Sequence, residues 1–477
     1  MARRAKIVCT LGPATQSYEA VRALVDAGMD VARLNFSHGT RAHHEQAYDW
    51  VRRASDESGR GVGVLVDLQG PKIRLGTFAA GPCVWAAGET VTITTEDCPG
   101  DHDRVSTTYD GLADDVAPGD RLLVDDGRLS LQVVSVAGPD VRLVVIEGGP
   151  VSSSKGLSLP GVAVSVPALS AKDIEDLRFA LGLRADLIAL SFVRSAADVT
   201  AVHALMDQAG VRLPVLAKIE KPEAVADLDA VVQAFDGLMI ARGDLGVEMP
   251  LERVPLVQKA AIQAAREQAK PVIVATQMLE SMITSSRPTR AEASDVANAV
   301  LDGADALMLS GETSVGLHPV RVVETMARII TVAEEQLGRV PRVVAEPSTV
   351  GGAIARAAAE VGRAVGAQAL VAFTQTGDTA RRLAEHRSPI PLLAFTPMPE
   401  VRSQLALTWG VETFLVPTVM HTDEMVRQVD TAMLDLERMR PGDLVTIVAG
   451  SPPSTSGSTN AMRVHRLGAA QTGGRTP

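Results

Sequence analysis

The 477-residue sequence predicts an α/β protein: a TIM (β/α)8 barrel, a small β-barrel lid domain inserted into it, and a separate C-terminal α/β domain. Eight apolar stretches before residue 315 are typical of buried parallel strands, and helical patterns separate most of them. Between the third and fourth stretches the pattern changes to short alternating runs with turn residues between them. A further series of strands and helices follows residue 341.

The predicted barrel strands are continuous apolar runs, as expected for strands that are covered on both faces. They are residues 6–12, 31–37, 62–70, 187–193, 214–220, 237–245, 271–279 and 306–312. Helical patterns between them include 18–27, 223–235, 255–269 and 291–301. Thr289 and Glu292 form a capping-box pattern at the start of the last of these helices. Because TIM barrels carry their chemistry at the C-terminal ends of the strands, we expect the site there.

The changes of pattern predict four segments. The first part of the barrel covers residues 1–70, the inserted β lid domain 71–167, the second part of the barrel 168–340, and the C-terminal α/β regulatory domain 341–477. An insertion on the catalytic face can close as a lid and exclude water.

Composition restricts the class of protein. Apolar residues make up 46% of the chain and aromatic residues only 3%, which favours an α/β enzyme over a disordered chain. The formal net charge of −11 argues against nucleic acid as a partner. Three cysteines are too few for a disulfide framework or a zinc site. No stretch of 18 apolar residues and no signal-peptide core occurs, so we expect a cytoplasmic protein with no membrane partner.

Charged side chains come where two predicted strands reach their C-terminal ends. Lys218 and Glu220 end the strand at 214–220, and Asp244 lies at the end of the strand at 237–245. Two carboxylates suit Mg²⁺, or Mn²⁺, which keeps water ligands and takes others from a substrate. We therefore expect Glu220 and Asp244 to bind the metal and Lys218 to face the same substrate. For any one of these residues, a salt-bridged strand end is an equally good interpretation.

Several long motifs of this sequence are similar to those of pyruvate kinase. They are Lys-Ile-Glu at 218–220, Ala-Arg-Gly-Asp-Leu-Gly-Val-Glu at 241–248, Ala-Thr-Gln-Met-Leu-Glu-Ser-Met at 275–282, Arg-Pro-Thr-Arg-Ala-Glu at 287–292 and Met-Leu-Ser-Gly-Glu-Thr at 308–313. The similarity extends from residue 6 to about residue 464. It implies a phosphotransferase of glycolysis (EC 2.7.1.40) that transfers the phosphoryl group of phosphoenolpyruvate to ADP. It also implies a homotetramer.

The resemblance implies roles for individual residues. The catalytic residues would be Lys218, Arg33, Thr276 and Arg74; the substrate would contact Arg33, Lys218, Gly243, Asp244 and Thr276; and the nucleotide would contact Asn35, His38, Arg74 and Lys155. A guanidinium can hold a phosphate by two parallel hydrogen bonds, which fits Arg33. A polar barrel layer is the alternative for Arg33, and a solvated loop charge is the alternative for Lys155.

Residues 67–74 depart from the family pattern. Most members read Asp-Thr-Lys-Gly-Pro-Glu-Ile-Arg, and this chain reads Asp-Leu-Gln-Gly-Pro-Lys-Ile-Arg. By resemblance Asn35, Ser37, Asp67 and Leu68 match the position of a monovalent cation, usually K⁺. The ammonium of Lys72 would replace that cation, so we expect K⁺ not to be required. In the alternative interpretation Lys72 faces solvent and K⁺ still binds.

Three threonines, Thr374, Thr376 and Thr379, lie between a predicted strand and a helix start in the last domain. Helix N-termini bind phosphate readily. The resemblance implies an allosteric site here for a sugar phosphate or a nucleotide, completed by the loop at 454–459. A Thr-capped helix without a ligand is an equally good interpretation.

Two other functions stay open at this point. A magnesium-dependent lyase of oxo-acids would also need a Glu and an Asp on neighbouring strands, but it would not need a lid that faces a nucleotide. A catalytically silent metabolite sensor would keep the fold and bind its ligand in the last domain. The presence of Lys218, Glu220, Asp244 and Thr276 argues against a silent protein.

Overall fold

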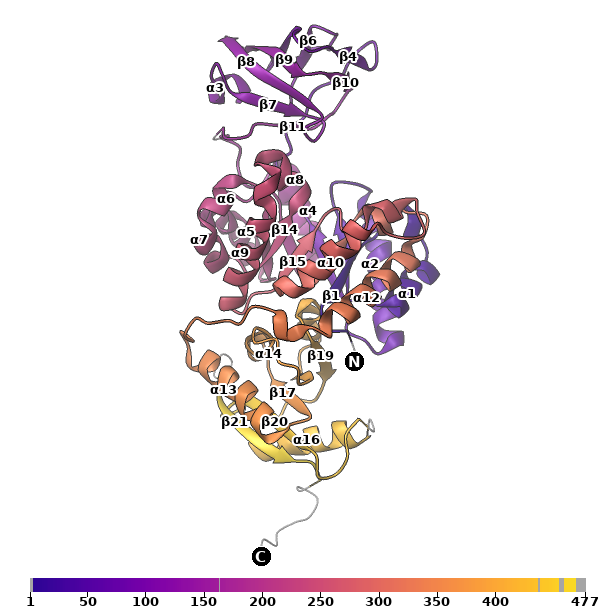
Figure 1. Cartoon of the computed structure of the whole chain (residues 1–477), viewed down its shortest axis with the longest axis vertical. Coiled ribbons are helices and arrows are strands. Elements are labelled where there is room, and N and C mark those ends of the chain that lie inside the picture. The colour runs from indigo at the N-terminus through magenta and orange to yellow at the C-terminus, as the bar shows by residue number, and fades with distance from the viewer. Residues whose placement is uncertain (1–2, 163, 436–437, 454–458, 469–477) are drawn as a thin grey trace, which may run out of the picture.

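A computed structural model describes residues 3–162, 164–435, 438–453 and 459–468 of the chain. The β domain, the barrel and the C-terminal domain follow one another along the long axis of the molecule, with the barrel in the middle (Figure 1). The inserted β domain and the C-terminal domain therefore lie at opposite ends of the barrel.

The predicted eight-stranded parallel barrel is confirmed, and it is closed in the order β1-β16-β15-β14-β13-β12-β3-β2. Its strands are β1 (Lys6–Thr10), β2 (Val31–Asn35), β3 (Gly63–Asp67), β12 (Leu187–Leu190), β13 (Val215–Ile219), β14 (Gly237–Ala241), β15 (Val272–Ala275) and β16 (Ala306–Leu309). Leu65, Met239 and Ile273 belong to an apolar cluster of barrel-strand side chains that also contains Leu407 of the C-terminal domain. Burial on both sides of the strands explains their continuous apolar sequences.

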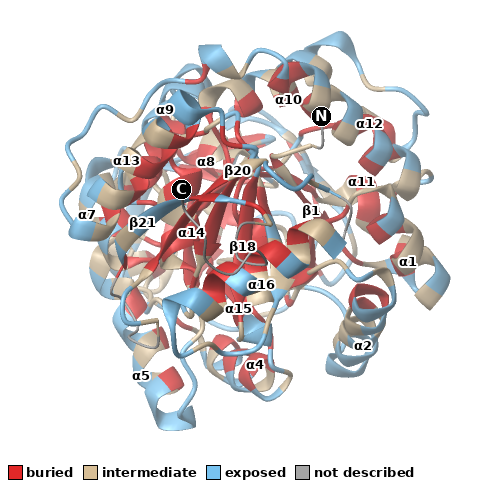
Figure 2. Cartoon of the chain, turned by 90° about the horizontal axis from the view of Figure 1, so that it is seen from below, coloured by how far each residue is buried: buried red, intermediate tan, exposed pale blue. Residues whose placement is uncertain are grey.

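Helices surround the barrel, and their exposed faces point outward (Figure 2). They are α1 (Tyr18–Ala27), α2 (Arg41–Ser58), α4 (Ala171–Gly182), α5 (Val199–Ala209), α6 (Pro222–Ala226), α7 (Leu228–Ala234), α8 (Arg242–Glu248), α9 (Val254–Glu267), α10 (Arg290–Asp302), α11 (Gly311–Ser314) and α12 (Pro319–Glu334). The capping box at the start of α10 is confirmed, because the Thr289 side chain accepts from the Glu292 N–H. Short 3-10 turns are Pro13–Thr15, Ala196–Asp198, Leu251–Arg253, Glu280–Ile283, Leu337–Arg339 and Leu405–Leu407.

All eight predicted barrel strands run past the observed C-terminal ends, and one predicted helix is divided. Two of the strand ends change where a predicted site residue lies. β14 ends at Ala241, where α8 begins, so Asp244 lies in the first turn of a helix and not at a strand end. β15 ends at Ala275, because Thr276 and Gln277 have φ of 66° and 55°, which no strand accommodates. The helix predicted at 223–235 is divided into α6 and α7 at Asp227, whose ψ is 38°.

The inserted domain consists of two sheets and one short helix. A six-stranded sheet has the order β11-β7-β8-β9-β5-β6, and β10 pairs with β4. The bounds are β4 (Cys83–Trp85), β5 (Thr90–Thr94), β6 (Arg104–Ser106), α3 (Leu112–Asp115), β7 (Arg121–Val124), β8 (Leu129–Ala137), β9 (Asp140–Glu147), β10 (Gly149–Val151) and β11 (Leu157–Ser158). In the linker to this domain, Gly70 has φ of 71°, and a Cβ there would lie 2.7 Å from the Phe192 ring. Only glycine fits this turn.

The C-terminal domain contains a five-stranded sheet in the order β19-β18-β17-β20-β21. Its elements are α13 (Val350–Val365), β17 (Ala369–Phe373), α14 (Asp378–Ala384), β18 (Leu392–Thr396), α15 (Pro399–Gln404), β19 (Val411–Leu415), α16 (Thr422–Asp435), β20 (Leu444–Gly450) and β21 (Thr459–Arg466). The sequence did not predict β21, an antiparallel edge strand that is mostly outside the core. Within the described residues, no helix is both long and apolar enough to span a bilayer.

Candidate active site

Lys218 lies near the end of β13, and three polar groups surround its ammonium. Nζ is 2.7 Å from Ser191 Oγ, 2.9 Å from Glu220 Oε1 and 3.2 Å from Asp67 Oδ1. Burial alone would lower the pKa of Lys218, but the charges of Asp67 and Glu220 outweigh it and raise the pKa above its ordinary value. Lys218 is therefore a fixed positive charge at the mouth of the barrel.

Asp67, at the end of β3, is shared by two cations. Its Oδ2 accepts from Arg33 Nε at 2.8 Å and lies 2.7 Å from Arg33 Nη2, while Oδ1 faces Lys218. Arg33 also donates from Nη1 to Thr10 Oγ1 at 2.9 Å. Burial alone would raise the pKa of Asp67, but Lys218 and Arg33 lower it below its ordinary value. Asp67 thus stays ionised and orients both cations.

Glu220 has a buried carboxylate oxygen that accepts no hydrogen bond. Oε2 accepts from the Phe192 N–H at 2.8 Å, whereas Oε1 forms only an ion pair with Lys218, at angles that are not those of a hydrogen bond. Burial raises the pKa of Glu220, Lys218 opposes this, and the negative charge of Asp244 adds to it. A free lone pair beside a second carboxylate fits a hard divalent cation.

The two carboxylates would be the only acidic ligands of such a cation. Within the described residues, no cluster of three or more His, Cys, Asp or Glu side chains is arranged to hold a metal. Mg²⁺ tolerates this, because it keeps several waters and takes ligands from substrate phosphates. The donor set therefore fits Mg²⁺ better than Ca²⁺, which needs six to eight oxygen ligands.

Thr276 contacts the start of α8 directly. Its Oγ1 accepts from the Gly243 N–H at 2.7 Å and donates to the Ala275 carbonyl oxygen at 2.6 Å. A Cβ on Gly243 would lie 3.5 Å from Thr276, an ordinary contact, so the protein itself leaves room for a side chain there. Any requirement for glycine at this position would come from a bound ligand.

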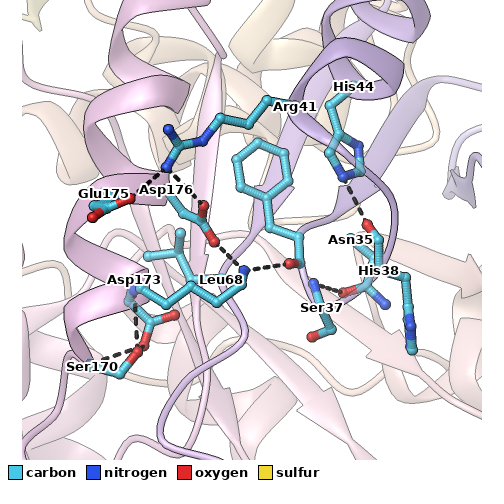
Figure 3. Close-up of polar contacts among 12 residues, drawn as sticks. Asn35, Ser37, His38, Arg41, His44, Leu68, Ser170, Asp173, Glu175 and Asp176 are labelled. Atoms are coloured by element: carbon cyan, nitrogen blue, oxygen red, sulfur yellow. Dashed lines mark hydrogen bonds and ion pairs between the residues drawn. The ribbon is translucent and has the colours of Figure 1, made fainter.

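Arg33, Asn35 and His38 line a cavity of about 820 Å³ beside the network, which is large enough for a nucleotide. Asn35 ends β2, and Ser37 and His38 lie on the loop that follows it (Figure 3). Asn35 Oδ1 accepts from the Ser37 N–H at 3.1 Å, and the His38 carbonyl lies 2.9 Å from His44 Nε2. Figure 3 also shows Leu68, which is buried and directly follows β3.

The predicted lid residues do not contact the Lys218 network. Lys155 pairs with Asp125 at 2.8 Å, and Arg74 Nη1 donates to the Ser154 carbonyl at 2.9 Å, both within the inserted domain. Lys72 lines a narrow cleft of about 50 Å³ together with Asp244. In the described part of the chain, Lys72 forms no ion pair or side-chain hydrogen bond with Asn35, Ser37, Asp67 or Leu68.

The three threonines of the C-terminal domain line one cavity of about 60 Å³. Thr374 Oγ1 accepts from the Gly377 N–H at 2.8 Å, and Thr379 Oγ1 lies 2.7 Å from Thr459 Oγ1. Thr376 is exposed. Residues 454–458 of the loop predicted to complete this site lie outside the described residues.

Two family models match the chain. The pyruvate kinase barrel domain matches residues 2–323, and the pyruvate kinase alpha/beta domain matches residues 352–465. The chain belongs to the pyruvate kinase family. The pyruvate kinase of Mycobacterium intracellulare is 66% identical over 98% of this chain and 99% of its own length. That of Corynebacterium glutamicum is 63% identical, with 98% of each chain covered.

A solved structure of the family agrees with the fold. The crystal structure of a pyruvate kinase from Cryptosporidium parvum superimposes with a TM-score of 0.90 and 36% identity, and it covers 98% of this chain and 96% of that chain. Since both chains match over nearly their whole length, the similarity extends beyond the barrel to the other domains.

Three groups that contact Lys218, Arg33 or Glu220 had no predicted role, although Ser191 was expected among the polar residues at the C-terminal strand ends. Ser191 accepts from Lys218, Thr10 accepts from Arg33, and the Phe192 N–H holds Glu220. Thr10 is the last residue of β1 and Ser191 directly follows β12, and a polar residue near the end of each apolar run was the available signal. The Phe192 contact depends on its left-handed backbone, with φ of 57°, and no sequence pattern indicates that conformation.

Proposed function

We propose that this protein transfers the phosphoryl group of phosphoenolpyruvate to ADP, giving ATP and, after protonation of the enolate, pyruvate. The observation that carries the proposal is the buried Lys218 ammonium, fixed between Asp67 and Glu220 beside the Arg33 guanidinium. Two cations held rigidly at the mouth of the barrel suit the charge of a migrating phosphoryl group, for which positioning and charge neutralisation supply most of the catalysis.

In this mechanism Arg33 binds the phosphoryl oxygens, and Lys218 neutralises the charge that develops during transfer. Asp67 keeps both cations in place, because it contacts each of them. Thr276 and the Gly243 N–H lie beside Asp244, where the carboxylate of the substrate would bind. Asn35 and His38 would contact the nucleotide in the adjoining cavity, with Arg74 and Lys155 approaching when the lid closes.

Glu220 and Asp244 would hold Mg²⁺, or Mn²⁺. Oε1 of Glu220, which is ion-paired with Lys218 but accepts no hydrogen bond, and the nearby charge of Asp244 support this assignment. When bound, the metal would supply positive charge to the oxygens of the phosphoryl group and of the enolate.

We also propose that K⁺ is not required. The Asp67 carboxylate already has two cationic partners, and Lys72 adds a tethered ammonium at the cleft beside Asp244. A tethered charge avoids the entropy cost of capturing a free ion. The proposal includes a cytoplasmic homotetramer of glycolysis, with Thr374, Thr376 and Thr379 at an effector site for a sugar phosphate or nucleotide.

A coupled assay of pyruvate formation tests the proposed function. With phosphoenolpyruvate, ADP and Mg²⁺ present, we expect pyruvate, and omission of ADP or of Mg²⁺ should abolish it. An oxo-acid lyase would not depend on ADP, and a silent sensor would form no pyruvate under any condition. No activity with metal and candidate effectors supplied would refute the proposal.

A further inference from the structure

Arg242, the first residue of α8, makes a dense set of contacts that the mechanism above does not use. Its Nη1 donates to Asp295 Oδ1 at 2.7 Å, and its Nη2 lies 2.7 Å from Asp295 Oδ2, which forms a two-point ion pair with α10. Nη2 also donates to the Thr276 carbonyl at 2.8 Å, and Nε donates to the Ala275 carbonyl at 3.3 Å. Arg242 thus ties α10 to the turn that follows β15.

That turn has an unusual backbone. Thr276 and Gln277 both have positive φ, and neither is a glycine. Non-glycine residues keep this conformation only where their surroundings enforce it, and such residues cluster at functional sites. Arg242 provides the enforcement, since it binds the carbonyls of the residue before the turn and of the first residue in it.

The Thr276 hydroxyl is not free to act on a substrate in this structure. It has one proton, which it donates to the Ala275 carbonyl at 2.6 Å, while its oxygen accepts from the Gly243 N–H. The resemblance to pyruvate kinase implies that Thr276 positions the water or proton relay that protonates the enolate. To donate to an enolate, or to a water beside one, the hydroxyl must turn away from Ala275. A buried carbonyl that is left without any donor costs free energy.

The Ala275 carbonyl has a second donor, the Nε of Arg242. A carbonyl oxygen accepts two hydrogen bonds, so Arg242 can keep this oxygen satisfied after the hydroxyl turns. We propose that Arg242, oriented by Asp295, is a positioning residue for enolate protonation. Its hydrogen bond to the Ala275 carbonyl allows the Thr276 hydroxyl to leave that carbonyl and donate elsewhere. In that step C3 of enolpyruvate gains the proton, the enolate oxygen becomes the C2 carbonyl, and the donor regains a proton from water.

This inference rests on the proposed function and assigns Arg242 to one of its two steps. The test measures both steps in Arg242→Met, Arg242→Lys and Asp295→Asn. Exchange of the pyruvate methyl protons in D2O, with Mg²⁺ and ATP present, reports protonation and is followed by proton NMR. ATP formation from phosphoenolpyruvate and ADP reports phosphoryl transfer. Arg253→Met, at an exposed arginine in the turn after α8, is the matched control.

We expect Arg242→Met to lower the exchange rate tenfold or more and ATP formation less than threefold. The exchange rates of Arg242→Lys and Asp295→Asn should lie between those of Arg242→Met and the wild type. The control, Arg253→Met, should leave the rates of exchange and of ATP formation unchanged. Equal loss of both rates, or no loss of exchange, would overturn the inference. If Arg242→Met does not fold, as judged by circular dichroism, the same comparison in Asp295→Asn decides.

A double substitution separates a specific role from general damage. If Arg242 acts through the Thr276 hydroxyl, then Arg242→Met should change exchange less than twofold when Thr276→Ala is already present. A further tenfold loss in that background would contradict the inference. A wild-type protein that forms neither ATP nor pyruvate would instead refute the proposed function, so the two failures are distinguishable.

Discussion

Replacing Lys218 by Met should slow phosphoryl transfer more than enolate protonation, whereas the Arg242 variants should slow enolate protonation more. Among the described residues, Lys218 is the only cation paired with Glu220 and one of two paired with Asp67, and the substitution removes it. Electrostatic groups of this kind contribute roughly 3 to 4 kcal/mol to a transition state, so phosphoryl transfer should slow about a hundredfold or more. Proton exchange of added pyruvate should partly survive, because Thr276 and Gly243 do not contact Lys218.

The folded state should tolerate this change. Breaking a buried ion pair costs about 3 to 5 kcal/mol, but Asp67 keeps Arg33 and Glu220 keeps the Phe192 N–H. Burial already raises the pKa of Glu220, and without Lys218 its carboxyl can take up a proton instead of staying charged. The loss in the free energy of unfolding should therefore lie at or below the lower end of that range.

ATP formation and methyl-proton exchange, measured on one preparation, provide the assay. Lys259→Met is the matched control, because Lys259 is half-exposed on α9 and, in the part of the chain that the structure describes, forms an ion pair with Asp302 alone. A similar fractional loss of both rates in Lys218→Met would refute the division of roles between Lys218 and Thr276.

Three further predictions concern Glu385, Lys72 and Thr376. Glu385 lies where the C-terminal domain contacts the barrel helix α9, because its carbonyl accepts from Arg266. Burial raises the pKa of Glu385 to about 7 although Arg382, Arg266 and Arg387 oppose it, so the folded state holds a proton that the unfolded chain releases above about pH 4.5. The free energy of unfolding should therefore fall by up to about 3 kcal/mol as pH rises from 4.5 through 7. Thermal midpoints measured over this pH range should show the decline in the wild type and a flatter decline in Glu385→Gln. The same slope of midpoint against pH in both proteins would contradict this prediction. Activity in tetramethylammonium or sodium buffer should approach that in K⁺ at matched ionic strength, and Lys72→Glu should be crippled without K⁺ and partly rescued by it. A wild-type protein activated tenfold or more by K⁺, about 1.4 kcal/mol, would show that Lys72 does not replace the cation. Thr376→Glu should abolish activation by a phosphorylated effector, because it places a carboxylate where the phosphate must bind; unchanged activation would remove Thr376 from that site.

The barrel could be predicted because strands buried on both faces have continuous apolar sequences. β3 is buried along its whole length, and its polar end residue, Asp67, points to the site. Where each strand ends could not be predicted. Residues 237–245 continue as a plausible strand in sequence, but the chain turns into α8 at Arg242. The edge strand β21 was missed because exposed and charged residues interrupt its apolar pattern.

The candidate site could be predicted as a set of residue types and not as a set of contacts. Lys218, Glu220 and Asp67 were recognised as polar ends of apolar runs. Their pairing depends on the register between β3, β12 and β13, which a sequence does not specify. Arg242 was not predicted as a functional residue, because its importance comes from the left-handed turn at Thr276, and that conformation is enforced by tertiary contacts.

Phosphorus NMR of phosphoenolpyruvate mixed with ADP and Mg²⁺ tests the central claim most directly, because it follows the phosphoryl group itself. We predict that the phosphoenolpyruvate signal is replaced by the γ-phosphate signal of ATP in equal amount, and that Glu220→Gln and Asp244→Asn lose this conversion together with Mn²⁺ binding measured by electron paramagnetic resonance. Release of inorganic phosphate without ATP, or full conversion in both variants, would contradict the account.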